Sequence, residues 1–463
     1  MGPAAGASSM SAHEPDENGV TTPGGVSGRT LGLWMCTALV VGNMIGSGVF
    51  LLPASLAPFG GISIVGWLVS TGGALCLALV FARLGAKIPK IGGPYAYARH
   101  GFGDFGGFIV AWSYWISIWT TNAALAVAFV SYSTVFVPAL ASSPALGGIA
   151  SLGILWILTF VNVQGVHHAG RVQLVTAILK ILPLAAIGLF GFFSFDASHF
   201  TPFNPSGGSA FGAISTTVTL TLWAFLGLES GTIPAGDVKD PTRTIPRATV
   251  MGTLTAAVIY IVCTVAVMGL IAPADLANST APFADAAGTM WGSAGVMIIG
   301  AGAAISCFGA LNGWVLLAGQ MPRAAALDGL LPEPFARLNA MGTPVVGLIF
   351  SSVVSTVLIG MNYTRGLVGA FTFLILLATL ATLLPYVLSS MTALMMALRE
   401  RGVAGAGSQA GRMAVASLAF GFSLWAIIGA GESTVYWGFV LIIVGLPVYA
   451  LMRYRTGSAS PEA

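Results

Sequence analysis

One stretch decides the fold class of this chain: Val41-Gly42-Asn43-Met44-Ile45-Gly46-Ser47-Gly48-Val49-Phe50. It lies inside an apolar run long enough to cross a bilayer, yet it contains three glycines, an asparagine and a serine. A helix in hydrocarbon must satisfy its own backbone hydrogen bonds, and glycine weakens it. The stretch therefore predicts a spanning helix interrupted at mid-membrane, as in the binding sites of secondary transporters. A small-residue face for close helix packing explains it equally well, so the rest of the chain must decide.

Composition places the chain among polytopic membrane proteins. Of its 463 residues, 56% are hydrophobic and only 7% are charged, whereas soluble domains carry about 25% charged residues. The four cysteines lie within apolar runs and have neither a disulfide framework nor metal-ligand spacing. Residues 1–28 are polar and rich in glycine, serine and proline, without the pattern of a secretory signal, and are expected to form a disordered tail.

Uncharged runs divide the chain into membrane spans. No charged residue occurs between Arg29 and Arg83, and residues 58–61 split this run into two spans, each longer than the ~20 residues that cross the hydrocarbon. Residues 87–104 are expected to form a polar loop. The predicted spans number twelve, at about residues 31–57, 62–86, 105–137, 146–165, 172–195, 210–233, 248–272, 286–318, 344–361, 366–397, 413–430 and 434–452.

Lysine and arginine are distributed unevenly between the predicted loops. With a cytoplasmic N-terminus, sixteen of the eighteen fall on the cytoplasmic side, Arg365 falls outside and Lys180 lies within a span. This positive-inside pattern places both termini in the cytoplasm. The expected organisation is a cytoplasmic tail (1–28), a core of ten spans (29–398), a cytoplasmic loop (399–412), two further spans (413–453) and a second cytoplasmic tail (454–463).

The sixth predicted span has the same unusual composition as the first. It reads Leu222-Trp223-Ala224-Phe225-Leu226-Gly227-Leu228-Glu229-Ser230-Gly231-Thr232. Because five spans separate corresponding positions, spans one and six cross the membrane in opposite senses. Two interrupted spans at matching places in oppositely oriented halves indicate an inverted-repeat transporter. We therefore expect an all-α membrane protein with a 5+5 inverted repeat, broken helices one and six, and two appended spans.

Two ionisable residues lie deep in the predicted spans, Glu229 and Lys180. A charge at the bilayer centre costs about 2.5–3.5 kcal/mol, so each needs a reason. Glu229 is interpreted as a counter-charge or proton carrier for a cationic substrate, and the alternative is a structural salt bridge with Lys180. Lys180 could replace a bound cation on backbone carbonyls of span one and exchange a proton, or it could snorkel to the cytoplasmic interface.

Span three places polar residues on one helix face. Asn122 is the informative member, because a lone amide in hydrocarbon needs a partner, and it could bind substrate or bridge helices. Trp223 and Trp314 lie away from the interfaces, where they could pack or cover an amine by cation–π contact. The face consists of Tyr114, Ser117, Ile118, Asn122 and Leu125, at i, i+3, i+4, i+8 and i+11.

Signatures of soluble enzymes do not occur in the sequence. It contains no phosphate-binding glycine loop, no His/Cys cluster with metal spacing and no basic aromatic surface for nucleic acid. His167 and His168 fall in a predicted cytoplasmic loop. We therefore expect no catalysis, no cofactor, no metal and no nucleic-acid partner. The expected partners are small-molecule substrates and the lipid bilayer, and the oligomeric state, a homodimer included, stays open.

Four segments of the chain resemble the amino acid–polyamine–organocation (APC) superfamily of transporters. Within it the resemblance is greatest to the bacterial arginine/agmatine antiporters, followed by the putrescine–ornithine and cadaverine–lysine exchangers. It covers all twelve predicted spans and implies the broken-helix fold, sodium-independent exchange and a place in the cell inner membrane. The four segments are Gly42–Phe50, Gly93–Arg99, Leu222–Ser230 and Gly313–Gln320.

The resemblance also implies roles for individual residues. Asn43–Gly48 of the broken first span would hold the carboxylate and amine of the substrate. The guanidinium side would be lined by Ser117, Ile118, Asn122 and Leu125. The aliphatic part of the substrate would be enclosed by Trp223, Leu226 and Trp314. The inner gate would consist of Tyr114, Glu229 and Tyr386, and Tyr95 would be tied to the pH response.

Three positions depart from the arginine/agmatine pattern. Leu125 replaces a methionine, Ala378 replaces a serine that contacts substrate, and Lys180 replaces a small apolar residue that is lysine in proton-coupled relatives. Two functions are therefore expected: exchange of a basic amino acid (arginine-like) for its decarboxylated amine (agmatine-like), or proton-coupled transport of neutral amino acids through Lys180. A receptor-like sensor on the same fold is a third.

Overall fold

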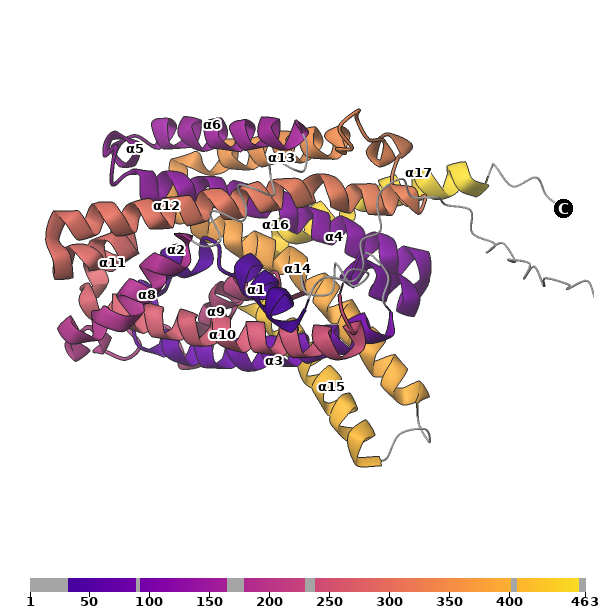
Figure 1. The fold of residues 1–463 in the computed structure, drawn as a ribbon, viewed down its shortest axis with the longest axis horizontal. Coiled ribbons are helices and arrows are strands. Elements are labelled where there is room, and N and C mark those ends of the chain that lie inside the picture. The colour runs from indigo at the N-terminus through magenta and orange to yellow at the C-terminus, as the bar shows by residue number, and fades with distance from the viewer. Residues whose placement is uncertain (1–31, 89–91, 165–178, 230–237, 401–405, 458–463) are drawn as a thin grey trace, which may run out of the picture.

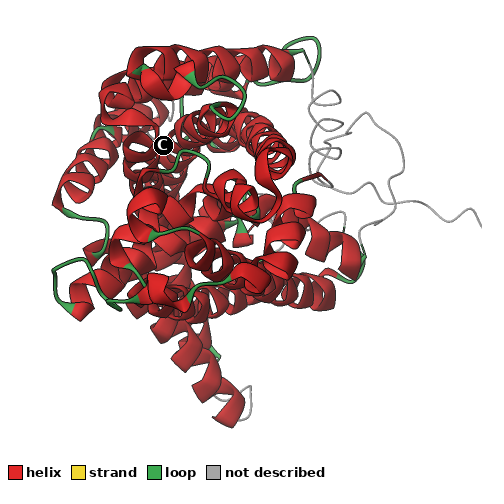
Figure 2. Cartoon of the chain, turned by 90° about the vertical axis from the view of Figure 1, so that its left-hand side faces the viewer, coloured by secondary structure: helices red, strands yellow, loops and turns green. Residues whose placement is uncertain are grey.

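The computed structural model describes residues 32–88, 92–164, 179–229, 238–400 and 406–457. Figure 1 shows four long helices that run along the long axis of the molecule: α3 (Ile62–Lys87), α6 (Pro144–Val163), α10 (Pro241–Leu270) and α12 (Pro282–Leu327). Two others project from the bundle, α15 (Ala406–Ile428) and the end of α14 (Gly366–Arg399). Many helices appear nearly end-on after a turn of 90° (Figure 2). The predicted tail 1–28, His167 and His168, and parts of predicted spans five and six lie outside the described residues.

The first crossing is broken where the sequence predicts it. α1 (Leu33–Met44) ends because Ile45 adopts an extended conformation, with φ −74° and ψ 94°, and α2 (Gly48–Leu56) begins at Gly48. The directions of the two helical parts differ by 41°. The interruption predicted from the glycine, asparagine and serine content of residues 41–50 is therefore confirmed.

The sixth predicted crossing also loses its helix at the predicted place. α9 (Ala210–Leu222) continues into the 3₁₀ turn η4 (Trp223–Phe225), after which Leu226 is extended and Gly227 has a φ of +99°. This φ is open to glycine and strained for other residues. Residues 230–237, which hold the rest of this span, lie outside the described ranges.

The two longest helices each bend near their N-terminal end. α4 (Pro94–Ser133) and α12 (Pro282–Leu327) both start with proline, and each contains one glycine with a left-handed backbone, Gly103 (φ 71°) and Gly292 (φ 63°). Proline is favoured in the first turn because it needs no hydrogen-bond acceptor there. Each helix therefore consists of a short leading segment and a long body that point in different directions.

The leading segment of α4 packs back against the body of the same helix. A Cβ atom built on Gly107 would lie 3.0 Å from Cβ of Arg99 and 3.3 Å from Cε2 of Tyr95, so the absence of a side chain makes room for both residues. The prediction of a polar loop over residues 87–104 is therefore wrong from residue 94 onward. Its polar composition reflects the position of this segment at the end of the bundle, and the segment is helical.

Among the described residues, eight helical segments are long and apolar enough to cross a bilayer, or nine if the bent pair Leu33–Met44 and Gly48–Phe59 counts as one. One segment, Val345–Arg399, comprises two helices that the turn η8 separates. Two shorter apolar segments, Ile181–Ser194 and Ala210–Phe225, lie at predicted spans five and six. The eight are Ile62–Lys87, Pro94–Ser133, Pro144–Val163, Thr242–Leu270, Pro282–Leu327, Val345–Arg399, Ser408–Ile428 and Glu432–Arg455.

The other elements follow the predicted order along the chain. The last predicted span is divided into two helices, α16 and α17, next to Val444. The remaining bounds are η1 (Ala57–Phe59), α3 (Ile62–Lys87), α5 (Ala139–Ser142), α6 (Pro144–Val163), α8 (Ile181–Phe190), η2 (Gly191–Ser194), η3 (Ala197–Phe200), α10 (Pro241–Leu270), α11 (Pro273–Asn278), η7 (Glu333–Ala336), α13 (Val345–Asn362), η8 (Tyr363–Arg365), α14 (Gly366–Arg399), α15 (Ala406–Ile428), α16 (Glu432–Ile443) and α17 (Gly445–Gly457).

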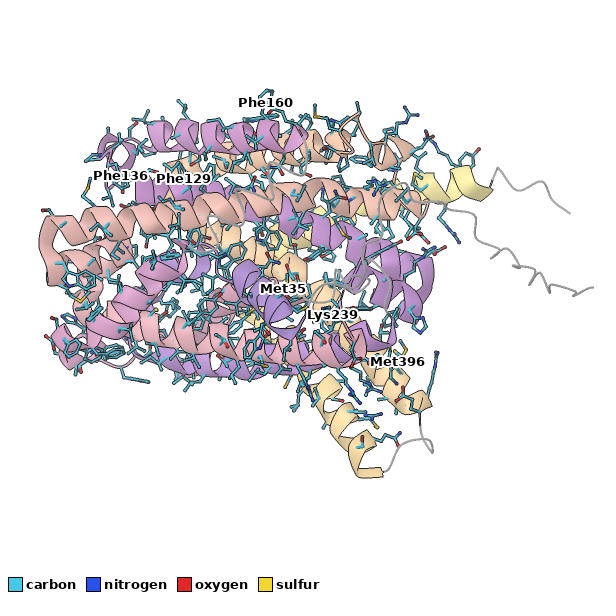
Figure 3. The ribbon with its side chains drawn as sticks, viewed as in Figure 1. Met35, Phe129, Phe136, Phe160, Lys239 and Met396 are labelled. Carbon is cyan, nitrogen blue, oxygen red and sulfur yellow. The ribbon has the colours of Figure 1, made fainter. Side chains whose placement is uncertain are left out.

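Large apolar side chains cover the outside of the bundle. Phe160 on α6 points away from the other helices (Figure 3) and is 64% exposed, and Phe136 is 43% exposed. An exposed apolar surface of this kind is unfavourable in water, whereas in a bilayer it contacts lipid hydrocarbon, which forms no hydrogen bonds. The exterior therefore fits a bilayer, and the polar groups that need partners gather inside.

Candidate substrate site and gate

The two interrupted segments contact each other in the centre of the bundle. A Cβ atom built on Gly227 would lie 3.3 Å from the carbonyl oxygen of Asn43, and one on Gly48 would lie 3.1 Å from Cδ1 of Trp223. These glycines let two irregular backbone segments approach more closely than any other residue would allow. The breaks of α1/α2 and of α9 therefore form one site.

The N-terminus of α2 presents free donors at this site. Among the described residues, no backbone carbonyl accepts a hydrogen bond from the N–H groups of Gly46, Ser47 or Gly48. Helix N-termini bind anions, because the N–H groups and the helix dipole both favour negative charge. This end of α2 can therefore hold a carboxylate.

A small cavity lies between the two breaks. Its volume is about 20 Å³, which is room for little more than one water molecule. The indoles of Trp223 and Trp314 form part of its wall, so an amino acid can enter only after side chains move. The lining residues are Asn43, Met44, Gly46, Ser47, Gly48, Thr121, Leu125, Trp223, Ala224, Leu226 and Trp314.

Five residues expected at the substrate do not line this small cavity. The hydroxyl of Ser117 donates to the carbonyl of Tyr114 on its own helix, and Ala378 is fully buried within α14. Ile45 contributes its carbonyl to another contact, and Ile118 lines a different cavity. The amide of Asn122 is buried, and neither of its polar atoms has a hydrogen-bond partner among the described residues.

Glu229 is held by two tyrosines. Its carboxylate is fully buried, and it accepts hydrogen bonds from the hydroxyls of Tyr114 at 2.7 Å and Tyr386 at 2.9 Å. α4 and α14 supply these donors, so three separate segments meet at one carboxylate. Within the described part of the chain no salt bridge joins Glu229 to Lys180, and the structural ion pair between them is therefore not formed.

Lys180 is bound to the break in the first crossing. Only 3% of the residue is exposed, and its ammonium donates to the carbonyl of Ile45 at 2.8 Å and to that of Gly42. Both carbonyls belong to the end of α1, where the helical hydrogen-bond pattern stops. The lysine therefore does not snorkel to the interface, because these two carbonyls hold its ammonium inside the bundle.

Tyr114 lines a second, larger cavity. Its volume is about 500 Å³, within the range of small-molecule sites. Tyr95 and Tyr114 are 19 positions apart on α4, about 28 Å along a straight helix, and both reach this cavity because α4 bends at Gly103. The lining residues are Gly92, Pro94, Tyr95, Tyr114, Ile118, Leu317, Gln320, Met321, Arg323, Ala324, Leu327 and Asp328.

The sequence pattern of amino acid permeases matches residues 31–459, nearly the whole chain. The chain belongs to the amino acid permease family. This confirms the expected APC transporter, and it confirms the expectation that the protein is not an enzyme, because the family is one of transporters. The two facing helix breaks are therefore its candidate transport site.

Curated relatives of this permease are named as amine and amino acid transporters. It is 36% identical over 366 residues to the cadaverine/lysine antiporter of Escherichia coli (strain K12), covering 78% of this chain and 82% of the relative. It is 34% identical over 428 residues to the putrescine transporter PotE of the same strain, covering 92% and 96%. Identity to PotE of Haemophilus influenzae is also 34%, over 429 residues, covering 92% and 97%.

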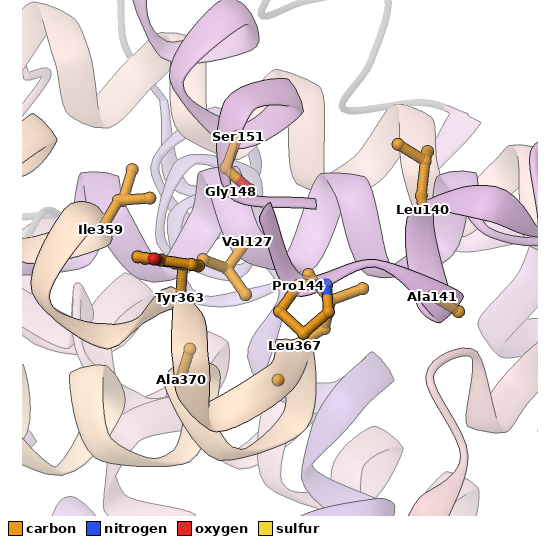
Figure 4. Close-up of a pocket in the computed structure, with 11 residues that line it drawn as sticks. Val127, Leu140, Ala141, Pro144, Gly148, Ser151, Ile359, Tyr363, Leu367 and Ala370 are labelled. Atoms are coloured by element: carbon orange, nitrogen blue, oxygen red, sulfur yellow. The ribbon is translucent and has the colours of Figure 1, made fainter. Parts of the chain in front are cut away.

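A third cavity of the permease is small and offers a substrate few polar contacts. It has a volume of about 30 Å³ and lies between α4, α6 and α14 (Figure 4). Its walls are mostly aliphatic, and the hydroxyl of Ser151 donates to the carbonyl of Gly147 on the same helix. The lining residues are Val127, Leu140, Ala141, Pro144, Gly148, Ser151, Ile359, Tyr363, Gly366, Leu367 and Ala370.

Thr121 and Ala224 line the small cavity of the permease, although the sequence did not single them out. The hydroxyl of Thr121 is buried and has no hydrogen-bond partner among the described residues, so it is free to bind a ligand. Its position three residues after Ile118 on the polar face of α4 could have identified it. Ala224 contributes backbone next to Gly48, and nothing in its side chain signals that role.

Proposed function

We propose that this chain is an antiporter that exchanges a basic amino acid for the amine left by its decarboxylation. The observation that carries the proposal is the pairing of an anion-binding helix end, at Gly46–Gly48, with a buried carboxylate, Glu229, at the second break. A basic amino acid carries both a carboxylate and a side-chain cation, and its decarboxylated amine keeps the cation. Relatives named as a cadaverine/lysine antiporter and a putrescine transporter support this substrate class.

The proposed contacts follow from charge. The free N–H groups of α2 would donate hydrogen bonds to the substrate carboxylate. The indoles of Trp223 and Trp314 would cover the aliphatic chain and its cation, and the unpartnered amide of Asn122 would turn toward the cationic end when the site opens. The decarboxylated amine would use only the contacts with the two indoles and the amide of Asn122. The same cavity could therefore hold either partner in turn, which an exchanger requires.

We propose alternating access through twelve crossings arranged as a 5+5 inverted repeat, with both termini in the cytoplasm. Support comes from pairs of matching features: breaks at Met44–Gly48 and at Leu222–Gly227, and bends at Gly103 and Gly292 in helices that both begin with proline. The large cavity would open to the cytoplasm, since arginines concentrate at that end. Tyr114, Tyr386 and Glu229 would form its gate, and a bacterial inner membrane is the proposed location.

Sodium independence is part of the proposal. The ammonium of Lys180 lies on the carbonyls of Gly42 and Ile45, where it supplies a positive charge from the protein itself. A coordinating ion is therefore not needed to hold the break. The same contact favours a second candidate function: a proton-coupled permease for neutral amino acids, in which Lys180 releases its proton when the break rearranges.

Exchange in reconstituted vesicles tests the proposal. Proteoliposomes loaded with agmatine, cadaverine or putrescine would be given labelled arginine, lysine or ornithine, in sodium and in potassium buffers. We expect uptake that requires an internal amine and is equal in both buffers, and the preferred pair defines the substrate. Uptake of alanine or serine into empty vesicles, driven by an imposed proton gradient, would instead establish the second candidate.

A further inference from the structure

The guanidinium of Arg323 lines the large cavity, and the proposed transport contacts give it no role. Its Nε is buried without a hydrogen-bond partner among the described residues. No salt bridge joins Arg323 to a carboxylate in the described part of the chain. Leaving a half-buried guanidinium unpaired costs free energy, because its charge and its donors have lost water without gaining a partner. Its five N–H donors match a planar acceptor.

Asp328, the one carboxylate among the described residues of the cavity wall, is already neutralised. Asp328 accepts the hydroxyl of Tyr95 at 2.6 Å and pairs with Arg99 at 2.9 Å. Arg99 also pairs with Asp104, which in turn contacts Arg453. Because Asp328 is bound to Tyr95 and Arg99, it does not form an ion pair with Arg323. The cavity therefore presents a net positive charge.

The two cavities lie in series along the same pair of helices. On α4 the small cavity is lined by Leu125 and the large one by Tyr114, about 16 Å apart along the helix axis. On α12 the corresponding residues are Trp314 and Arg323, about 14 Å apart. A substrate that passes the gate at Tyr114 thus enters a chamber containing Arg323.

We propose that the large cavity is a second binding station for the carboxylate-bearing substrate, with Arg323 as its anchor. A guanidinium binds a carboxylate through two parallel hydrogen bonds, and the amide of Gln320, three residues earlier on the same helix face, adds donors and an acceptor nearby. An amine without a carboxylate gains nothing there and is repelled by Arg323. The station therefore distinguishes the two exchanged partners on one side of the membrane. This inference rests on the proposed antiport function.

Counting bound ligand tests the station without transport. The purified full-length chain in lipid nanodiscs would be titrated with labelled L-lysine, L-arginine or L-alanine, and with cadaverine as the probe that lacks a carboxylate. We expect two molecules of the preferred amino acid per chain, one in the Arg323→Gln variant, and one cadaverine in both. A single bound amino acid in both proteins, with unchanged affinity, would overturn the proposal. Displacement of the second molecule by millimolar inorganic phosphate alone would show a general anion site and overturn it as well.

Sided transport gives the second readout. In everted membrane vesicles, which expose the cytoplasmic face, Arg323→Gln is expected to raise the half-saturating concentration of the amino acid about tenfold and leave that of the amine unchanged. Right-side-out vesicles should show no change, and Arg323→Lys should recover part of the loss. The matched control is Arg337→Gln, which removes an exposed arginine paired with Glu333. Equal changes on both faces would contradict the station. Arg323-dependent binding without any exchange would refute the antiport function and leave the site standing.

Discussion

The ammonium of Lys180 donates a 2.8 Å hydrogen bond to the carbonyl oxygen of Ile45. This contact ties the fifth predicted crossing to the break in the first. The carbonyl of Gly42 accepts a second bond from the same group, so one cation satisfies two of the acceptors that the end of α1 leaves open. The break thus depends on a residue more than 130 positions away in sequence.

Replacing this lysine is expected to disable transport. Lys180→Met keeps the length of the side chain and removes its donors, and hydrogen bonds from a charged donor contribute about 1.5–3 kcal/mol each. We expect amine-dependent exchange to fall at least tenfold and thermal stability in detergent to drop by several degrees. The measurements are uptake into proteoliposomes and a thermal denaturation curve.

Lys239 offers a matched control for this variant. Its side chain lies at an exposed position, and Lys239→Met removes the same charge without touching either break. It should retain wild-type exchange and stability. If Lys180→Met also exchanged at the wild-type rate, the ammonium would have no part in holding the break or in coupling.

The break between α1 and α2, to which Lys180 is bound, shows what the sequence could predict. Glycine, asparagine and serine in an uncharged run allow an interruption or a close-packing face, and the matching composition of the sixth span favours the interruption. The back-folded helix at residues 94–102 could not be found in this way, because the space over Gly107 has meaning only once Arg99 is known to occupy it. In the sequence Arg323 is one of the sixteen basic residues assigned to the cytoplasmic side, and spacing alone does not show that a cavity lies beside it.

Glu229 should be required for exchange of cationic substrates. Glu229→Gln removes the charge, and its amide nitrogen cannot accept the hydrogen bond that Tyr386 now donates. We expect uptake of basic amino acids to fall at least tenfold and to lose most of its dependence on pH. Initial rates measured from pH 5 to pH 8 would show this. Full activity with an unchanged pH profile would assign the carboxylate a role in packing alone.

The tyrosines around Glu229 provide a graded comparison. Tyr386→Phe removes one hydrogen bond to the buried carboxylate and keeps the ring that packs against Phe81. Loss of a hydrogen bond to a charged group costs about 1.5–3 kcal/mol, which corresponds to a shift of about 10- to 150-fold in the closing equilibrium. We expect an Ile118→Cys side chain in the large cavity to react with a thiol reagent at a changed rate. We also expect uptake to become partly independent of internal amine. An unaltered labelling rate would exclude a gating role for this contact.

Gly227 is expected to tolerate no side chain. Its φ of +99° is unfavourable for any other residue, and a Cβ atom would lie 3.3 Å from the carbonyl oxygen of Asn43. Gly227→Ala should therefore cost about 1–3 kcal/mol and force the two breaks apart. Exchange should fall more than stability, because the displaced segment lines the substrate cavity. Gly72→Ala, at an exposed helical position with no atoms near the added Cβ, should leave both unchanged.

The contact between α15 and α9 predicts the most destabilising glycine substitution. A Cβ atom on Gly429 would lie 1.9 Å from the carbonyl oxygen of Ser215 and 2.3 Å from Oγ1 of Thr219. Backbone cannot yield as a flexible side chain would, so Gly429→Ala must separate the helices and break the hydrogen bond from Thr219 to Ala426. Overpacking of this kind costs about 1–3 kcal/mol or more. We expect a clear loss of thermal stability in detergent, together with reduced exchange, because α9 leads directly into the second break. Gly421→Ala in α15, where an added Cβ meets nothing, should be neutral or slightly stabilising, and equal melting temperatures for the two variants would mean that α15 does not pack against α9 in the membrane.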